Sequence, residues 1–385
     1  MKCKLSDICD FRKGKVDISK LTLKTYISTE NMLPNKGGIT EAISLPTIQQ
    51  TQEYKKGDVL VSNIRPYFKK IWRAKYDGGC SNDVLVFKGN SNIDGDFLYY
   101  VLANDEFFDY SMATSKGTKM PRGDKTSIMQ YEAPLIDLQV QKKIASVLKV
   151  LDEKIELNNE INNNLEQQTQ AIFKSWFVDF ELNYGIMPSD WKVSQLGSIA
   201  KISTEVFSPA KNQNVEVEHY SIPAYDEKCY PVFETSNGIK SNKYRLSSNS
   251  VMISKLNPDT KRIWRPYCIS DNPICSTEFI VYEPINPLNR DFIYSIIDSI
   301  GFSAFLCSHT TGSTNSRQRA TPSITLTYDI VVPDEKTIRA FCSIVSPMYD
   351  TIENNIKENQ KLAETRDKLL PKLMSGELDV SDFDL

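Results

Sequence analysis

The sequence contains few of the residues from which catalytic and metal sites are built. Only two histidines, His219 and His309, occur among 385 residues, and the eight cysteines form no Cys-x-x-Cys pair. This usage predicts neither a zinc site nor a disulfide framework, and no histidine is placed for a catalytic triad. Gly-x-x-x-x-Gly-Lys-Ser/Thr, Gly-x-Gly-x-x-Gly and Asn/Asp-Pro-Pro-aromatic motifs are also missing. We therefore expect no catalytic residue and no metal ligand in this chain. The expected function is the binding of another molecule.

Long apolar runs and a strong net charge are missing as well. The most apolar helical stretch, 292–307, is interrupted by three serines and one aspartate, which predicts a buried helix and no membrane span. The residues after Met1 are polar, so we expect no signal peptide and a cytoplasmic location. A net charge of −3 excludes a uniformly basic surface but leaves local basic patches open. The length allows two or three globular domains.

A long amphipathic helix is written twice in the sequence. Apolar residues recur with alternating steps of four and three over more than four heptads, first from Ile144 and again from Phe341. Each position of the second pattern lies 197 residues after its counterpart in the first. A helix that buries only a narrow seam needs a partner, and its own copy is the natural one. The expected seam residues are Leu148, Leu151, Ile155, Asn158, Asn162, Leu165, Ile172 and Trp176, with Val345, Met348, Ile352, Asn355, Asn359, Leu362, Leu369 and Leu373 in the copy.

The rest of the chain is also duplicated. Four blocks recur in the same order, with an offset that grows from 192 to 195 residues and reaches 197 at the long helix, as small loop insertions in one ancestral unit would produce. The matched blocks are 59–66 with 251–258, 70–73 with 262–265, 80–87 with 275–282, and 96–99 with 291–294; Gly117, Thr118 and Arg122 match Gly312, Ser313 and Arg317.

Local signals place the elements of each copy. Strands are predicted at 59–63 and 84–87 and at their copies, helices at 97–110 and 292–306, and loops at 114–124 and 308–319. Pro134 ends the last strand of the first copy, and Asp137 caps the long helix. In the second copy, Ser346 and Pro347 resemble a cap followed by a first-turn proline, which predicts a later helix start. Pro371 predicts a kink or an end.

These elements predict an α+β fold with a pseudo-twofold internal repeat. Two similar globular domains (1–136 and 183–336) are expected to be separated by an antiparallel coiled coil of two long helices (137–182 and 337–385). Parallel pairing would require a return path along the whole rod, which is roughly 60 Å for ~40 residues. The seam asparagines are expected to set register; a docking role is the alternative.

Basic residues cluster at the same place in both copies, interleaved with Tyr67, Phe68 and Trp72 in the first, and this favours DNA as the ligand. Lysine and arginine suit phosphates, and arginine, asparagine and glutamine read base edges in the major groove. A solvated charged face is the alternative for each run taken alone. The expected DNA-binding residues are Asn63, Arg65, Tyr67, Lys69, Lys70, Lys116, Lys119 and Arg122 in the first domain, and Lys255, Asn257, Lys261, Arg262, Asn315, Arg317, Gln318 and Arg319 in the second.

Several motifs resemble the specificity subunits of type I restriction-modification enzymes, and this resemblance covers nearly the whole chain. Trp191 and Lys192 before Leu196 and Gly197 look like the usual entry to a recognition domain. One departure is 335–338, where many members carry a glutamine-containing helix start like that at Gln141. The most specific motifs are QKKIA at 141–145, LDEKI at 151–155, QAIFKSWF at 170–177 and LLPKLMSGEL at 369–378.

The resemblance implies a subunit that reads a bipartite target in double-stranded DNA, one half-site per domain, with a gap set by the coiled coil. It also implies two methyltransferase subunits, which carry S-adenosylmethionine and flip the target adenine, and motor-nuclease subunits that use ATP and Mg²⁺. No cofactor is expected in this chain itself.

Two other interpretations remain open on the residues alone. The first is a non-catalytic coiled-coil adaptor whose two domains bind proteins. The second is an enzyme that acts alone, such as a nuclease or a methyltransferase. The target sequence, the gap length, the methylated adenines and the division between base-reading and phosphate-binding residues are not encoded in any pattern that we could read.

Overall fold

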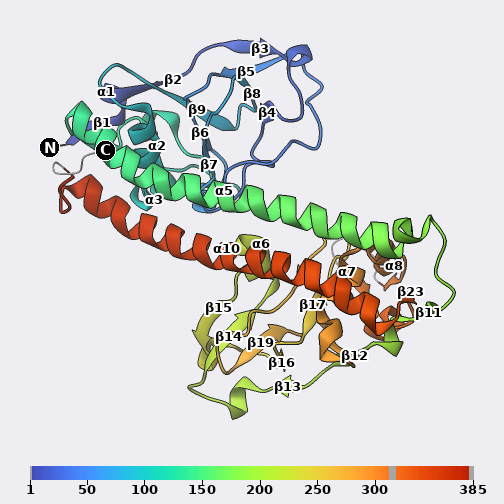
Figure 1. Cartoon of the computed structure of the whole chain (residues 1–385). Helices are drawn as coiled ribbons and strands as arrows, with labels where there is room; N and C mark the ends of the chain where they lie inside the picture. Colours follow the sequence, from blue (N-terminus) through green and yellow to red (C-terminus); the bar gives the residue numbers. More distant parts are fainter. Residues whose placement is uncertain (1, 312–317, 381–385) are drawn as a thin grey trace. The chain divides into compact units, whose positions relative to one another are not determined.

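The computed structural model describes residues 2–311 and 318–380, and the chain divides into two compact units. Unit 1 comprises Met1–Ile155 with Lys361–Leu385, and unit 2 comprises Glu156–Gln360. The two long helices are α5 (Leu138–Phe177) and α10 (Glu335–Ser375), and each contributes one part to unit 1 and the other part to unit 2 (Figure 1).

Unit 1 contains two four-stranded sheets and a short strand pair. The first sheet has the order β2-β9-β6-β7, the second has the order β3-β5-β8-β4, and β1 pairs with β10. The strands are β1 (Lys2–Lys4), β2 (Cys9–Phe11), β3 (Lys15–Asp17), β4 (Tyr26–Ile27), β5 (Gln50–Tyr54), β6 (Val59–Ser62), β7 (Ile71–Arg73), β8 (Gly78–Cys80), β9 (Val84–Gly89) and β10 (Glu132–Pro134). The short helices are α1 (Leu5–Ile8), α2 (Gly95–Ala103), α3 (Asp105–Ala113) and α4 (Lys125–Ile128).

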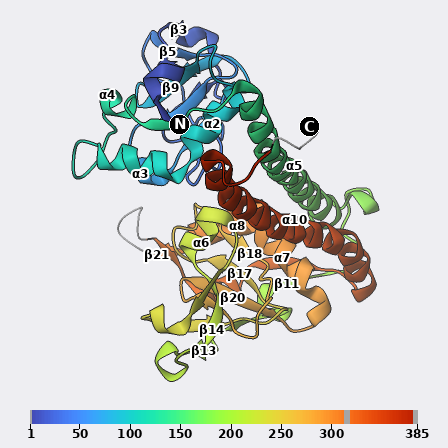
Figure 2. The ribbon, with the colours of Figure 1, turned by 90° about the vertical axis from the view of Figure 1, so that its left-hand side faces the viewer.

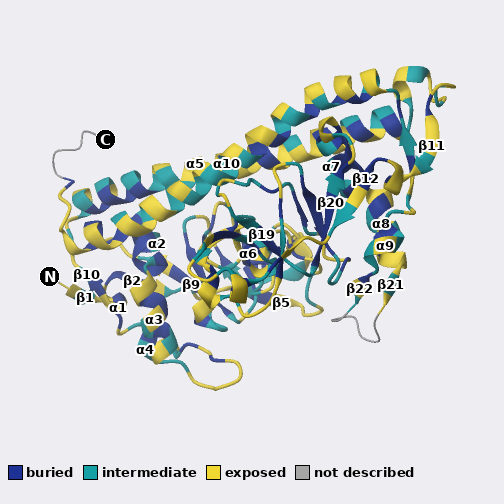
Figure 3. Cartoon of the chain, turned by 90° about the horizontal axis from the view of Figure 1, so that it is seen from below, coloured by how far each residue is buried: buried dark blue, intermediate teal, exposed yellow. Residues whose placement is uncertain are grey.

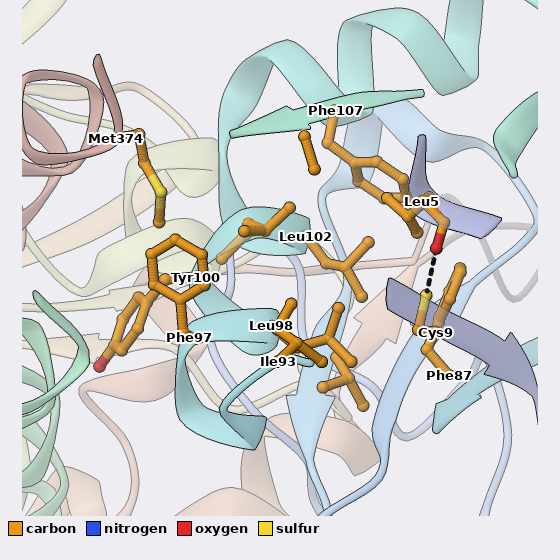
Figure 4. Close-up of a cluster of buried hydrophobic side chains, with 14 of the residues drawn as sticks. Leu5, Cys9, Phe87, Ile93, Phe97, Leu98, Tyr100, Leu102, Phe107 and Met374 are labelled. Carbon is orange, nitrogen blue, oxygen red and sulfur yellow. Dashed lines mark hydrogen bonds between the residues drawn. The ribbon is translucent and has the colours of Figure 1, made fainter. Parts of the chain in front are cut away.

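The core of unit 1 lies where the first sheet meets α2 and α3. Phe97 of α2 and Phe107 of α3 are fully buried in one cluster with Phe87 of β9, and the ring centroids of Phe107 and Phe87 are 6.3 Å apart (Figure 4). Met374 from the end of α10 belongs to the same cluster, so the long helix is part of the core of the unit. Burial of apolar area of this kind is the main force that holds the domain to the helices.

Unit 2 repeats this plan, with a fifth strand in its second sheet and one additional short strand pair. Its sheets have the orders β12-β20-β17-β18 and β13-β16-β19-β14-β15, and β11 pairs with β23 and β21 with β22 (Figure 2). The strands are β11 (Lys192–Gln195), β12 (Ala200–Ser203), β13 (Val206–Phe207), β14 (Glu216–Tyr220), β15 (Val232–Thr235), β16 (Lys243–Arg245), β17 (Val251–Ser254), β18 (Ile263–Trp264), β19 (Pro273–Ser276), β20 (Phe279–Pro284), β21 (Thr310–Thr311), β22 (Arg319–Ala320) and β23 (Asp329–Val332). The helices are α6 (Ile222–Lys228), α7 (Arg290–Asp298), α8 (Ile300–Ser308) and α9 (Pro322–Thr325).

The internal repeat is visible element by element. Strand β6 corresponds to β17 at an offset of 192, β9 to β20 at 195, and α4 to α9 at 197. The corresponding sheets also have the same strand order, apart from the added β15. The predicted fold class is therefore confirmed in its α+β composition, its duplication and its two long helices.

Each stretch predicted as one helix at 97–110 and 292–306 is in fact two helices. The breaks fall at Asn104 and Ser299, whose side chains accept backbone N–H groups of the following helices, from Glu106 (3.2 Å) and Phe302 (3.1 Å). A side chain that caps a new helix competes with continuation of the old one.

Within 2–311 and 318–380, no single helix is long and apolar enough to cross a membrane, although the bent pair Pro287–Asp298 and Ile300–Ser308 meets those criteria together.

Helix α10 begins earlier than the prolines predicted. It starts at Glu335, 197 residues after Leu138, and runs through Pro347 and Pro371 to Ser375, so the prediction of a start at Pro347 is wrong and the helix does not end at Pro371. Asp334 caps the first turn by accepting the N–H of Thr337 (3.1 Å). Ile338, Phe341 and Val345 of the early turns are buried in the core of unit 2. This burial offsets the ~3 kcal/mol that an internal proline costs.

The two long helices pair antiparallel, as predicted. In unit 2, Asn158 donates to Asn359 and Asn355 donates to Asn162, each at 2.8 Å, so the residue number rises on one helix as it falls on the other. In unit 1, Arg366 contacts Asp152 at 2.7 Å in the same sense. Each of the sixteen expected seam residues is buried or half-buried, and buried and exposed residues alternate along both helices (Figure 3).

Candidate nucleic-acid interface

Two loops of unit 1 that carry most of the expected DNA-binding residues are joined by backbone hydrogen bonds. The loop after β6 meets the loop between α3 and α4, which stands out from the domain in Figure 2. The N–H of Arg65 donates to the carbonyl of Pro121 (2.8 Å), and the N–H of Gly123 donates to Asn63 (3.2 Å). Lys116 and Arg122 exchange two backbone bonds across the second loop, at 2.8 and 2.9 Å. The fold thus brings together residues that are about 60 positions apart in sequence.

A third loop, 29–38, is hydrogen-bonded to the loop after β6, although no sequence pattern predicts this contact. The N–H of Lys36 donates to the carbonyl of Lys69 (2.9 Å), and the side chain of Lys70 donates to the carbonyl of Thr29 (2.6 Å). The turn residues Pro34, Asn35, Gly37 and Gly38 signal a loop but not its neighbours.

Unit 2 repeats the same backbone bonds. The N–H of Asn257 donates to the carbonyl of Gln318 (2.9 Å), and the N–H of Ala320 donates to Lys255 (2.9 Å). Asn257 has φ 47° and its counterpart Arg65 has φ 50°, a left-handed conformation that is uncommon for residues other than glycine. Retention of this conformation in both copies indicates that the loop shape itself is inherited.

An arginine held by a carboxylate occupies the same position in both units. Arg122 pairs with Asp83 at 3.2 Å, and Arg319 pairs with Glu278 at 3.0 Å. Backbone bridges link Ile64 to Arg122 and Leu256 to Arg319, so Arg319 is the counterpart of Arg122. The predicted match of Arg122 with Arg317 is therefore wrong. Arg317 and Asn315 lie outside the described residues.

The arginine pairs are half-exposed, so they contribute little to stability. Side-chain exposure is 55% for Arg122 and 46% for Arg319. Exposed ion pairs are worth roughly 0–1 kcal/mol. The Glu278 hydrogen bond raises the pKa of Arg319, which stays charged at any physiological pH. Both guanidinium groups thus remain accessible while one edge is oriented by a carboxylate.

Other expected residues on these loops of unit 1 differ in how far their side chains are exposed to solvent. The rings of Tyr67 and Phe68 are exposed, and their centroids are 4.6 Å apart. Lys119 is exposed, and Lys116 reaches Asp124 (2.6 Å), which lowers the pKa of that carboxyl to about 2.

Four further expected cations are engaged within the protein, and the first is Lys69, which pairs with Asp105 at 2.9 Å. Burial lowers the pKa of Lys70, whose ammonium donates to a backbone carbonyl. Lys261 contacts Asp298 at 2.5 Å, and Arg262 donates to both oxygens of Asp226 at 2.5 and 2.9 Å. Their carboxylate partners lie on α6 and α7, distant in sequence, so the pattern of charges alone could not reveal them.

Among residues 2–311 and 318–380, no group of three or more His, Cys, Asp or Glu side chains could hold a metal ion. A cavity of about 730 Å³ in unit 2 is lined mainly by apolar groups, including Phe173, Phe177 and Ile300.

Comparison with known proteins agrees with this geometry. Residues 1–167 match the family described as "Type I restriction modification DNA specificity domain". The type I restriction enzyme MjaIX specificity subunit of Methanocaldococcus jannaschii is 25% identical over 86% of this chain and 79% of its own length. The HindI specificity subunit of Haemophilus influenzae is 25% identical over 97% of this chain and 98% of its own length.

A solved structure supports the fold. The type I restriction-modification S subunit of M. genitalium superposes with a TM-score of 0.60 at 16% identity, over 99% of this chain and 96% of that one. The sequence comparisons thus confirm the resemblance to the specificity subunits of type I restriction-modification enzymes, and the solved structure shows the shared fold.

Proposed function

We propose that this chain is the sequence-reading, non-catalytic subunit of a type I restriction-modification complex, and that each globular domain reads one half of a bipartite target in duplex DNA. The observation that carries the proposal is the duplicated loop scaffold, which presents Arg122 and Arg319 at corresponding positions of the two domains. Two similar binding surfaces on one chain suit a ligand with two short sites at a fixed spacing.

The arginine geometry suits DNA contacts. Glu278 occupies the Nε and Nη2 edge of Arg319 at 3.0 and 3.2 Å, which leaves the Nη1 donors for a ligand. Arginine is the side chain that most often reads guanine, and it also binds phosphate. The exposed rings of Tyr67 and Phe68 provide stacking or sugar contacts in unit 1 only.

The paired long helices would set the gap between half-sites and dock the methyltransferase subunits. The asparagine pairs Asn158–Asn359 and Asn162–Asn355 support a fixed register, because a polar seam layer pairs only in one alignment. Leu157 and Ile161 expose apolar surface one helical turn apart on α5, as a docking surface would.

The cofactors of the reaction belong to the partners under this proposal. Two methyltransferase subunits would carry S-adenosylmethionine, and motor-nuclease subunits would use ATP and Mg²⁺. This assignment rests on the family resemblance, and it places adenine flipping and transfer of the methyl group in a partner's pocket.

Salt-dependent binding of the full chain to a duplex tests the proposal. The affinity should fall by orders of magnitude between about 50 and 200 mM salt, because several phosphates release counterions on binding. An adaptor whose domains bind proteins would show no such dependence. Incubation of the chain alone with DNA, Mg²⁺, ATP and S-adenosylmethionine should give no turnover, and cleavage or methylation by the chain alone would contradict the non-catalytic assignment.

A further inference from the structure

Unit 1 contains a polar pocket that lies outside the expected DNA-binding residues. Its volume is about 290 Å³, near the lower end of the size of small-ligand sites. The lining includes three cationic and three amide side chains and no carboxylate. These polar side chains are Arg12, Lys15, Gln50, Gln52, Asn82 and Lys125.

Strand register explains why these side chains converge. Lys15 on β3 lies directly opposite Gln52 on β5, so the two side chains share one face of the sheet. Gln50 lies two residues before Gln52 and projects from the same face. Asn82 follows β8, the next strand of that sheet, and Lys125 opens α4.

The charge of the pocket is positive. Arg12 is neutralised by Asp58, to which its Nη2 donates at 2.8 Å. Lys15 and Lys125 make no ion pair within the described ranges 2–311 and 318–380; Lys125 only approaches the ring of Phe11, at 5.9 Å.

The nearest carboxylates already have partners. Asp17, opposite Gln50, accepts the N–H of Ser19 at 3.0 Å. Glu53, which packs over Gly14, pairs with Lys55 at 3.7 Å. The two lysine ammonium groups therefore remain available to a phosphate.

The pocket is continuous with the candidate interface. Asn82 immediately precedes Asp83, which holds Arg122 at 3.2 Å. Lys125 immediately follows Asp124, which holds Lys116 at 2.6 Å. A strand of DNA bound at Arg122 and Lys116 would therefore reach the pocket without leaving the surface of unit 1.

The corresponding positions of unit 2 lack this chemistry. The cross-strand pair Lys15–Gln52 corresponds to Val206–Tyr244, and Lys125 at the start of α4 corresponds to Pro322 at the start of α9. The pocket chemistry is therefore specific to unit 1 and is not part of the inherited scaffold.

We propose that this pocket is a nucleotide subsite of unit 1, in which Lys15 and Lys125 hold a backbone phosphate and the amides of Gln50, Gln52 and Asn82 contact a base edge. The inference rests on the proposed DNA-reading function and extends it. It makes the two domains unequal, since unit 1 gains contacts that unit 2 does not have. Glutamine and asparagine are suited to adenine edges, and lysine to phosphate as a point charge.

The first test measures the salt dependence of binding by the full chain. The probe is a labelled duplex enriched from a random pool by the unchanged chain. Combining Lys15→Ala with Lys125→Ala should reduce the slope of log K against log salt by about 1 in total, for every duplex sequence, because the two lysines hold one phosphate. Lys142→Ala, which removes an exposed lysine of unit 1 on α5, should leave the slope unchanged. All substituted side chains are exposed, so unchanged thermal melting serves as the folding control.

The second test locates the contact. Ethylation of individual phosphates should interfere with binding at positions where the lysine variant no longer shows interference. Gln50→Ala with Gln52→Ala and Asn82→Ala should relax base preference in one half-site and leave the other half-site unchanged.

The outcomes separate the subsite from the function on which it rests. Steep salt dependence of the unchanged chain, with the same slope and interference pattern in the lysine variant, would overturn the subsite alone. A pocket for free nucleotides would instead bind deoxynucleoside monophosphates through Lys15 and Lys125 with unchanged duplex binding, which would also overturn the inference. If the unchanged chain binds no duplex, the proposed function is refuted and the subsite with it.

Discussion

The two units share a backbone scaffold but differ in the side chains that it presents. The bonds Arg65 to Pro121 and Asn257 to Gln318 are equivalent, yet one loop presents an arginine and the other an asparagine. The backbone conformation of the loops has therefore been retained since the duplication, while the side chains on them have changed. A scaffold kept constant while its exposed residues diverge is what two readers of different half-sites require. The exposed Tyr67 and Phe68 likewise correspond to Asp259 and Thr260.

The same comparison applies to the ion pair behind the loops. Arg73 pairs with Asp96 in unit 1, and Arg265 pairs with Asp291 at the equivalent positions in unit 2. In unit 2 the arginine also reaches Asp350 (2.7 Å) and Glu353 (3.1 Å) of α10 and is 12% exposed, whereas Arg73 is 33% exposed. In unit 2 the arginine thus anchors the domain to α10 directly, whereas in unit 1 Asp96 is the member of the pair that reaches the long helix, through Lys149 of α5 (3.6 Å).

The largest expected effect tests that anchor. Arg265→Ala should destabilise the protein by about 3 kcal/mol, because it leaves the buried carboxylate of Asp291 without its ion-pair partner. Arg73→Ala, at the equivalent but more exposed position, should cost about 1 kcal/mol. Urea unfolding of both variants measures the difference, and equal losses would show that the two pairs have not diverged. Arg339→Ala, which removes an exposed pair with Glu335 on α10, is the control and should cost about 0.3–0.5 kcal/mol.

The seam provides the second comparison, between the polar layer of unit 2 and the apolar seam at Leu148 of unit 1. Asn158 is fully buried and donates to Asn359. Asn158→Leu should cost about 1–3 kcal/mol, because Asn359 and Glu358 lose a hydrogen-bond donor. Combining it with Asn359→Leu should recover part of the loss. A double variant whose loss is the simple sum of the two single losses would argue against a paired asparagine layer.

The sequence predicted what depends on periodicity and order, and missed what depends on tertiary neighbours. The duplication, the antiparallel seam and the cap at Asp137 could be read because each is a local pattern repeated along the chain. The start of α10 was missed because burial of Phe341 outweighs the proline signal at Pro347. The loop 29–38 and the partners of Lys261 and Arg262 were missed because these contacts join segments with no common pattern.

The third prediction compares the two arginines that the scaffold holds in common. Arg122→Ala and Arg319→Ala should each weaken binding to a selected duplex by about 1–3 kcal/mol and relax base choice, each in a different half-site. Selection of bound duplexes from a random pool measures this for both variants. Relaxation of the same half-site by both would contradict the assignment of one half-site to each domain, and uniform weakening of all sequences would identify the arginines as phosphate contacts.

The smallest expected effect concerns acid stability and a position where the units differ completely. Asp105 begins α3 and holds Lys69 (2.9 Å) and Lys36 (3.0 Å), whereas its counterpart at the start of α8 is Ile300, which is 86% exposed. Burial acts to raise the pKa of Asp105, but hydrogen bonds from the two lysines outweigh it and the pKa is lowered.

Because the folded pKa lies below the unfolded value, the pair stabilises the protein above about pH 4, and this contribution disappears as the pH falls through the folded pKa. Asp105 is 55% exposed, so the loss in Asp105→Asn should stay below about 1 kcal/mol. Thermal melting should separate the variant from the unchanged protein at pH 7 and bring the two together under acid. A gap that persists under acid would mean that Asp105 acts through packing or helix capping and not through its charge, while Ile300→Asn in unit 2 should show no pH-dependent gap at all.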